Sequence, residues 1–219
     1  MAINLVIFAL KIAKITPELM IATGVWAARQ ARDGRGYRQE VALRYYARFV
    51  LTNDLLPLLH KAKDLGEPAS VLTLIGVGMG PEVIIDNLGL KKNYGGWKAI
   101  WQSICYNLLM VSEFARREPN IAFTHIYPGN VDTGMLVFTN PLARFFMFLL
   151  CPFIWLITVT PEECAQWLLF ALFDAEGGLN RRSNKGDDIG MKNFPETKDA
   201  QKAVWEHSMQ ATTVDTPVK

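Results

Sequence analysis

The chain has 219 residues, of which 50% are hydrophobic and 20% are charged, and its formal net charge is +2. This composition excludes a disordered chain, and the small net charge argues against a nucleic-acid partner. Three cysteines without a CxxC pair and three histidines indicate neither a disulfide framework nor a metal site, so we expect no metal and a cytoplasmic protein. A chain of this length suits one domain, which we place at 1–211, followed by a loose tail at 212–219.

The apolar start of the chain, MAINLVIFAL, does not have the order of a secretory signal peptide. Such a peptide carries its positive charge before the apolar run, whereas Lys11 and Lys14 follow it here. We therefore do not expect secretion. The run Ile3–Leu10 is instead a candidate edge strand.

Short apolar runs that end in turn residues predict the strands. They lie at 19–25 (LMIATGV), 70–75 (SVLTLI) and 121–127 (IAFTHIY). The polar stretch 177–190 is predicted as a loop with room for a short edge strand.

Helical patterns fill the intervals between these runs, at 39–63, 97–117, 160–174 and 198–211. The third helix begins with Thr160-Pro161-Glu162-Glu163, which suits an N-cap, a proline at the first helical position and a capping box. Strands separated by helices predict an α/β fold with a shortened, doubly wound, Rossmann-like and mainly parallel sheet. Ligands of such sheets bind beyond the carboxyl ends of the strands, which directs attention to the loops 24–36, 76–96 and 128–144.

The segment from Phe145 to Val159, FFMFLLCPFIWLITV, has no charge, but its 15 residues fall short of a membrane span and Pro152 interrupts it. Three interpretations remain open: a buried helix pair, a lid over an apolar substrate, or a patch for peripheral membrane contact. We predict a helical wall of an apolar pocket, with Phe148 and Trp155 as candidate substrate contacts.

The sequence IAFTHIYPGNVDT, a strand followed by Pro128-Gly129-x-Val-x-Thr133, resembles the short-chain dehydrogenase/reductase family. Other segments follow in that family's order: Ala22-Thr23-Gly24, the helix at 43–59, and Tyr94 with Lys98 at YxxxK spacing. The likeness covers about residues 18–209 and is greatest to a fungal branch that works in secondary metabolism. It implies that the substrate site includes Gly76, Pro128, Gly129 and Thr133.

Members of that family hold a nicotinamide dinucleotide on an initial GxxxGxG turn, and residues 1–30 contain no such turn. The chain enters the family pattern only at its fourth strand. It is therefore either a fragment of a longer protein or a form that has lost dinucleotide binding, and we expect no cofactor. The run Gly76, Gly78, Gly80 is a weak candidate for a phosphate loop, because Pro81 follows where a helix would have to open.

The catalytic set that the resemblance implies is incomplete. No Ser or Thr occurs from Leu74 to Gln102, where the family places its serine. Tyr94 and Lys98 are the candidate acid/base pair. The family's helix asparagine falls on Arg44, and Tyr106 is a rival phenol, so these two are candidate oxyanion donors. His125 is more typical of a core histidine than of a base.

Three functions remain open. The first is a cofactor-independent cyclase, isomerase or dehydratase that acts on an apolar polyketide-like or terpenoid-like molecule. The second is an NAD(P)-dependent oxidoreductase of which this chain is a part, and the third is a catalytically inactive partner subunit. Because the family pairs through its long helices, here 39–63 and 97–117, we expect a homodimer.

Overall fold

The computed structural model describes residues 41–132, 157–191, 194 and 198–213. The predicted strands at 3–10 and 19–25, Thr133, and the greater part of 145–159 with Phe148 and Trp155 lie outside the described residues.

The described sheet has three parallel strands in the order β1-β2-β3, with bounds Ser70–Leu74, Ala122–Ile126 and Gly178–Arg182. The first two match the predicted apolar runs, and the third is the edge strand within the polar stretch. The expected α/β, Rossmann-like architecture with a parallel sheet is confirmed.

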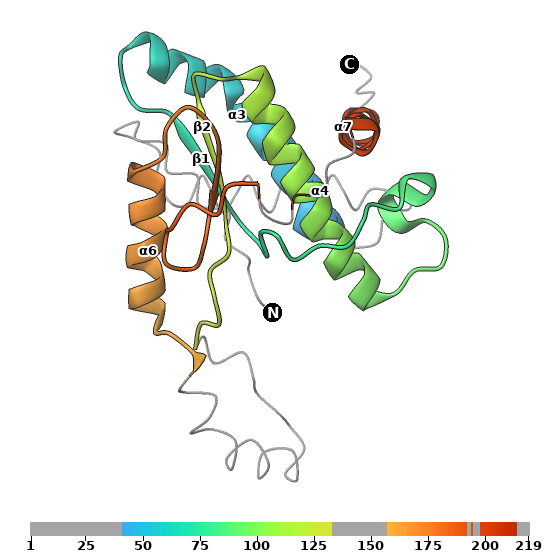
Figure 1. Ribbon diagram of the computed structural model, residues 1–219. Helices are drawn as coiled ribbons and strands as arrows, with labels where there is room; N and C mark the ends of the chain where they lie inside the picture. Colours follow the sequence, from blue (N-terminus) through green and yellow to red (C-terminus); the bar gives the residue numbers. More distant parts are fainter. Residues whose placement is uncertain (1–40, 133–156, 192–193, 195–197, 214–219) are drawn as a thin grey trace, which may run out of the picture.

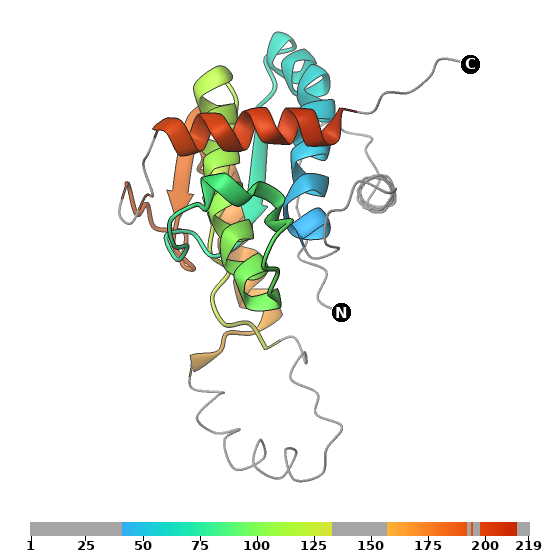
Figure 2. The same cartoon turned by 90° about the vertical axis from the view of Figure 1, so that its right-hand side faces the viewer.

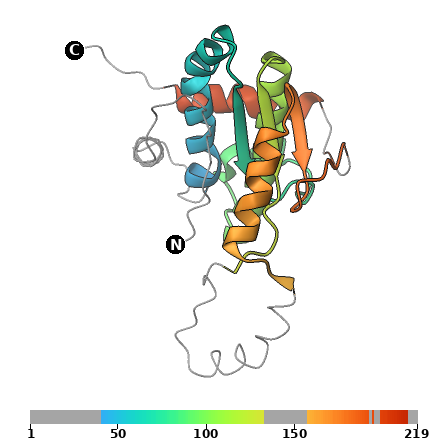
Figure 3. The same ribbon diagram turned by 90° about the vertical axis from the view of Figure 1, so that its left-hand side faces the viewer.

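Helices cover both faces of this sheet (Figures 1 and 3). Helices α3 (Ala47–Asp64) and α4 (Gly96–Arg117) lie on one face, and α6 (Pro161–Phe173) lies on the other. The N-cap of α6 is as predicted, since the Thr160 hydroxyl accepts a hydrogen bond from the Glu163 amide at 3.2 Å. A π-helical turn, η1 (Ala42–Tyr46), precedes α3, and a 3-10 segment, η2 (Ile85–Leu90), precedes α4.

Side chains alternate between the two faces of the sheet and so form two separate parts of the core. Phe123 of β2 points toward α4, where its ring stacks on Phe114 at a centroid distance of 5.7 Å. Ile126 points the other way and packs with Leu72 in the cluster formed with α6. Since side chains alternate across a strand, His125 shares the α4 side of the sheet with Phe123.

The last helix, α7 (Lys198–Thr212), crosses the outer side of α3 and α4 (Figure 2). Its Trp205 packs edge-on against Phe114 at 4.9 Å, and its Ser208 hydroxyl is 2.6 Å from the hydroxyl of Tyr45. The predicted helix at 198–211 is thus confirmed and forms a third layer.

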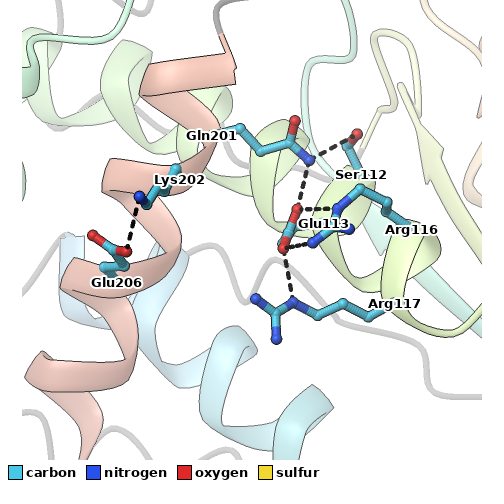
Figure 4. A network of polar contacts seen from close by, with 7 residues as sticks. All are labelled: Ser112, Glu113, Arg116, Arg117, Gln201, Lys202 and Glu206. Atoms are coloured by element: carbon cyan, nitrogen blue, oxygen red, sulfur yellow. Dashed lines mark hydrogen bonds and ion pairs between the residues drawn. The ribbon is translucent and has the colours of Figure 1, made fainter.

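A polar network joins α7 to α4 at the far end from the carboxyl edge of the sheet (Figure 4). The Glu113 carboxylate accepts hydrogen bonds from Arg116, from Arg117 at 2.7 Å and from the amide of Gln201 at 3.0 Å. The two arginines lower the pKa of Glu113, the Arg116 hydrogen bond most, although burial opposes them. The carboxylate therefore stays ionised and connects the two helices.

Candidate functional site

The carboxyl ends of the three strands meet at one edge of the sheet, and three of the predicted substrate residues lie there. Gly76 follows β1 after one residue, and Pro128 and Gly129 follow β2. Gly129 has a φ of +77°, a conformation that favours glycine, and an added Cβ would lie 3.2 Å from Asn184. The structure thus brings Gly76, Pro128 and Gly129 to the edge where such folds bind ligands.

The glycine run after β1 packs closely on α4. A Cβ added at Gly76 would lie 3.4 Å from the Ile104 side chain, and one added at Gly80 would overlap with the sulfur of Cys105. The close approach of loop and helix accounts for Gly76 and Gly80. Opposite Gly76, α4 presents the aliphatic side chain of Ile104.

Tyr94 and Lys98 have different surroundings. Tyr94 lies just before α4 and is half-buried against the core formed with α3 and α4. Lys98 lines a shallow, open depression of about 790 Å³, together with Met79, Glu82 and Trp101 among others. Tyr94 is not among the residues that line this depression, so their joint role remains a prediction.

Tyr106 is buried in the core, 5.2 Å from Tyr45 between ring centroids, and among the described residues its hydroxyl has no well-aligned hydrogen bond, although the backbone of Gly89 acts on it. Burial raises the pKa of this phenol to about 12. Arg44 is half-buried in the π-helical turn, and its carbonyl accepts a hydrogen bond from Asn107 at 2.9 Å. One turn further along, Arg48 is fully buried.

Arg48 approaches β1 from α3. Its side chain is buried, and Nη1 donates to the carbonyl oxygen of Leu74 at 3.0 Å. Burial, and the neighbouring charge of Arg44, lower the pKa of Arg48 to about 10, so the guanidinium is still charged at neutral pH.

His125 lies in the central strand and is buried, as expected of a core histidine, yet neither ring nitrogen forms a well-aligned hydrogen bond with any of the described residues. Burial lowers its pKa to about 3, with smaller contributions from the charges of Arg181 and Arg48, while the backbone of Ile75 opposes the shift. The imidazole is therefore neutral across the physiological range.

Few of the described groups near this edge suit proton transfer at neutral pH. Burial raises the pKa of the Cys105 thiol to about 12, as it does for the Tyr106 phenol, and it lowers that of His125 to about 3. An efficient general acid or base has a pKa near the working pH. These three groups are therefore suited to shaping or hydrogen-bonding a ligand rather than to exchanging protons with it.

Sequence reasoning missed Arg48 and Arg181, the two buried arginines on this side of the sheet. A signal was available for Arg48, which stands one helical turn after Arg44 and so shares its stripe. Arg181 gave no signal, because the strand that carries it, GLNRR, is polar.

Among the residues described here, no cluster of histidine, cysteine or acidic side chains could hold a metal ion. None of the helices in the described part of the chain is long and apolar enough to cross a bilayer.

No family model matches the sequence. Curated fungal proteins do match it: an oxidoreductase of Emericella nidulans at 33% identity and the oxidoreductase andH of Emericella variicolor at 30%. The NmrA-like family domain-containing oxidoreductase notO of an Aspergillus species matches at 30% identity. The matches cover 61%, 69% and 56% of this chain but 40%, 44% and 37% of those proteins, so the chain spans less than half of each relative.

The fold is also similar to the crystal structure of an uncharacterised protein from Mycobacterium paratuberculosis. The TM-score is 0.53 at 20% sequence identity, over 84% of this chain and 62% of that one. This similarity supports the Rossmann-like fold.

Proposed function

We propose that the chain is the substrate-side half of a short-chain-dehydrogenase-like scaffold of fungal secondary metabolism. In this proposal it binds an apolar small molecule at the carboxyl edge of its sheet and promotes a cyclisation, isomerisation or dehydration without hydride transfer. The fungal oxidoreductases similar to the chain support the scaffold. The parallel sheet, with Gly76, Pro128 and Gly129 at its carboxyl edge, supports the location.

The observation that carries the proposal is the contact between the loop after β1 and α4. The family likeness implies a serine after this strand and a tyrosine–lysine pair on the next helix. At this place the chain has Gly76, with the Ile104 side chain 3.4 Å from where its Cβ would be. An aliphatic contact can order a flexible apolar chain by proximity, and it offers no proton or oxyanion donor for hydride chemistry.

Tyr94 is the proposed acid/base group of this reaction, assisted by Lys98. A general acid or base contributes about 10²–10⁴-fold to a rate. Turnover is measured with an apolar compound that the chain binds. Tyr94→Phe should lower this turnover at least about tenfold. Tyr127→Phe is the matched control. Full activity of Tyr94→Phe would remove this phenol from the mechanism.

Binding experiments test the proposal directly. The purified chain is titrated with NADPH, followed by nicotinamide fluorescence, and with the apolar alcohol farnesol, followed by tryptophan fluorescence. We expect farnesol to bind saturably and NADPH to bind weakly or not at all. A low-micromolar dissociation constant for NADPH would refute the cofactor-independent function.

The second candidate is an NAD(P)-dependent oxidoreductase to which this chain contributes only one part. The names of the three fungal relatives favour it, since all three are called oxidoreductases. Turnover that appears only when NADPH is added would establish this alternative.

A further inference from the structure

Arg48 and His125 hold unused hydrogen-bonding groups inside the protein. Arg48 is 2% exposed, and its Nε and Nη2 have no hydrogen-bond partner among the residues that the structure describes, although Nη1 is bonded to Leu74. His125 is 0% exposed, and within the described part of the chain neither ring nitrogen forms a well-aligned hydrogen bond, although the backbone of Ile75 acts on the ring. A buried donor left unsatisfied costs about 1–3 kcal/mol, and more when it is charged. An acceptor that bound to these donors would remove this free-energy penalty.

The two side chains stand at a place where ligands bind in this type of fold. His125 is paired in register with Thr73 of β1 and with Arg181 of β3, so the three residues form a row across the sheet. Each is the last but one residue of its strand. The row is therefore just inside the carboxyl edge of the sheet, on the side that faces α4.

Arg48 and Arg181 make the surroundings of His125 positive, while the Asp188 carboxylate acts on Arg181. Arg48 has no salt bridge with any acidic side chain of the described residues, and the charges of Arg48 and Arg181 both act on His125. Arg181 is itself anchored, with Nη1 donating to the carbonyl of Gly190 at 2.6 Å and its guanidinium 5.3 Å from the centre of the Phe194 ring. It flanks the histidine as a fixed charge.

We propose that Arg48, His125 and Arg181 form a binding site for an anionic group, a carboxylate or a phosphate. The free Nε and Nη2 of Arg48 have the fork geometry that such a group accepts in bidentate fashion. The N–H of His125 is a third donor, and Arg181 adds attraction from the far side. This inference rests on the proposed function for the apolar remainder of the ligand. The substrate class is then an apolar chain that ends in an acid.

Decanoate and decanol test the site, because they share an apolar chain and differ in the charge of the head group. Their dissociation constants are measured by calorimetry for the wild type, Arg48→Met and the control Lys61→Met, an exposed position of the same helix. We expect decanoate to bind the wild type and Lys61→Met about tenfold or more tightly than decanol, as charge-assisted bonds allow. In Arg48→Met the preference should disappear while decanol binds as before.

Thermal unfolding provides a second measurement, with inorganic phosphate compared with chloride at equal ionic strength. Phosphate should raise the midpoint of the wild type and not that of Arg48→Met. Without anions the variant should unfold close to the midpoint of the wild type, because the loss of the bond to Leu74 is offset by the removal of an uncompensated buried charge.

The outcomes separate this inference from the proposed function. If decanol binds and decanoate binds no better, the anion site is refuted and the apolar site stands. If neither decyl compound binds but phosphate stabilises the wild type through Arg48, the anion site stands and the apolar function fails. If Arg48→Met is strongly destabilised and no anion affects the wild type, an acidic group of the chain already occupies the site and the inference is overturned.

Discussion

Replacing Glu113 with glutamine should weaken the attachment of α7 to α4. Glu113 is 8% exposed, and its carboxylate accepts from Arg116, Arg117 and Gln201 (Figure 4). The two arginines are 66% and 45% exposed, so solvent screens both ion pairs, and the one with Arg117 contributes at most about 1 kcal/mol. The bond from the Gln201 amide to the buried carboxylate belongs to a stronger class, about 1.5–3 kcal/mol. Glutamine retains one acceptor, so we expect a net loss of about 2 kcal/mol.

The loss is measured by urea unfolding, followed by tryptophan fluorescence, and by the thermal midpoint. A change of about 2 kcal/mol lowers the midpoint by about 4–8 °C in a protein of this size. The matched control is Glu206→Gln, whose pairing with Lys202 at 3.9 Å joins two largely exposed side chains of α7 and should cost less than about 0.5 kcal/mol.

The effect of Glu113→Gln should depend on pH. The folded-state pKa of Glu113 lies below that of the unfolded chain, so its carboxylate stabilises the fold above the unfolded value and the gain is lost as the pH falls through the folded value. The difference between wild type and variant should therefore be full at pH 7 and shrink in acid. Equal losses for Glu113→Gln and Glu206→Gln, or a difference that does not change with pH, would refute this account of the network.

Three further predictions concern packing, capping and thiol chemistry. A Cβ at Gly177 would lie 2.6 Å from the carbonyl oxygen of Pro119, so Gly177→Ala should lower the free energy of urea unfolding by about 1–3 kcal/mol. The control is Gly96→Ala, whose added Cβ has nothing within 4 Å and should leave the stability unchanged or raise it. Thr160→Ala removes the N-cap of α6 and should lower the free energy of unfolding by about 1 kcal/mol. Thr160→Ser keeps a hydroxyl at the N-cap and should not lower it. Burial raises the pKa of Cys105 to about 12, so iodoacetamide at pH 8 should label it far more slowly in the native protein than in urea, as peptide mass spectrometry would show.

The strands and helices could be predicted where their signal is local. Apolar runs marked β1 and β2, and the Thr160-Pro161 cap marked the start of α6. The short edge strand β3 was only a suggestion within a polar stretch, because its pairing with β2 is a tertiary contact that its own residues do not announce.

The site could be predicted less well than the fold. Pro128 and Gly129 were placed correctly at the carboxyl edge, since they follow a strand directly. The family resemblance directed attention to Arg44, whereas the arginine enclosed against β1 is Arg48. Spacing alone contains no information on which turn of a helix meets the sheet, nor on the π-helical turn that precedes α3.

The bond from Arg48 to Leu74 also limits how strands can pair along β1. Carbonyl groups of β1 point alternately to its two sides, and that of Ala69 bonds to Ala122 of β2. The Leu74 carbonyl therefore points to the opposite side, where Arg48 takes it. A further strand beside β1 on that side could pair with it as far as Leu72, but it could not take the Leu74 carbonyl as an acceptor. One guanidinium thus occupies the last outward-facing carbonyl of β1 and ends the hydrogen-bond ladder one residue before the carboxyl edge of the sheet is passed.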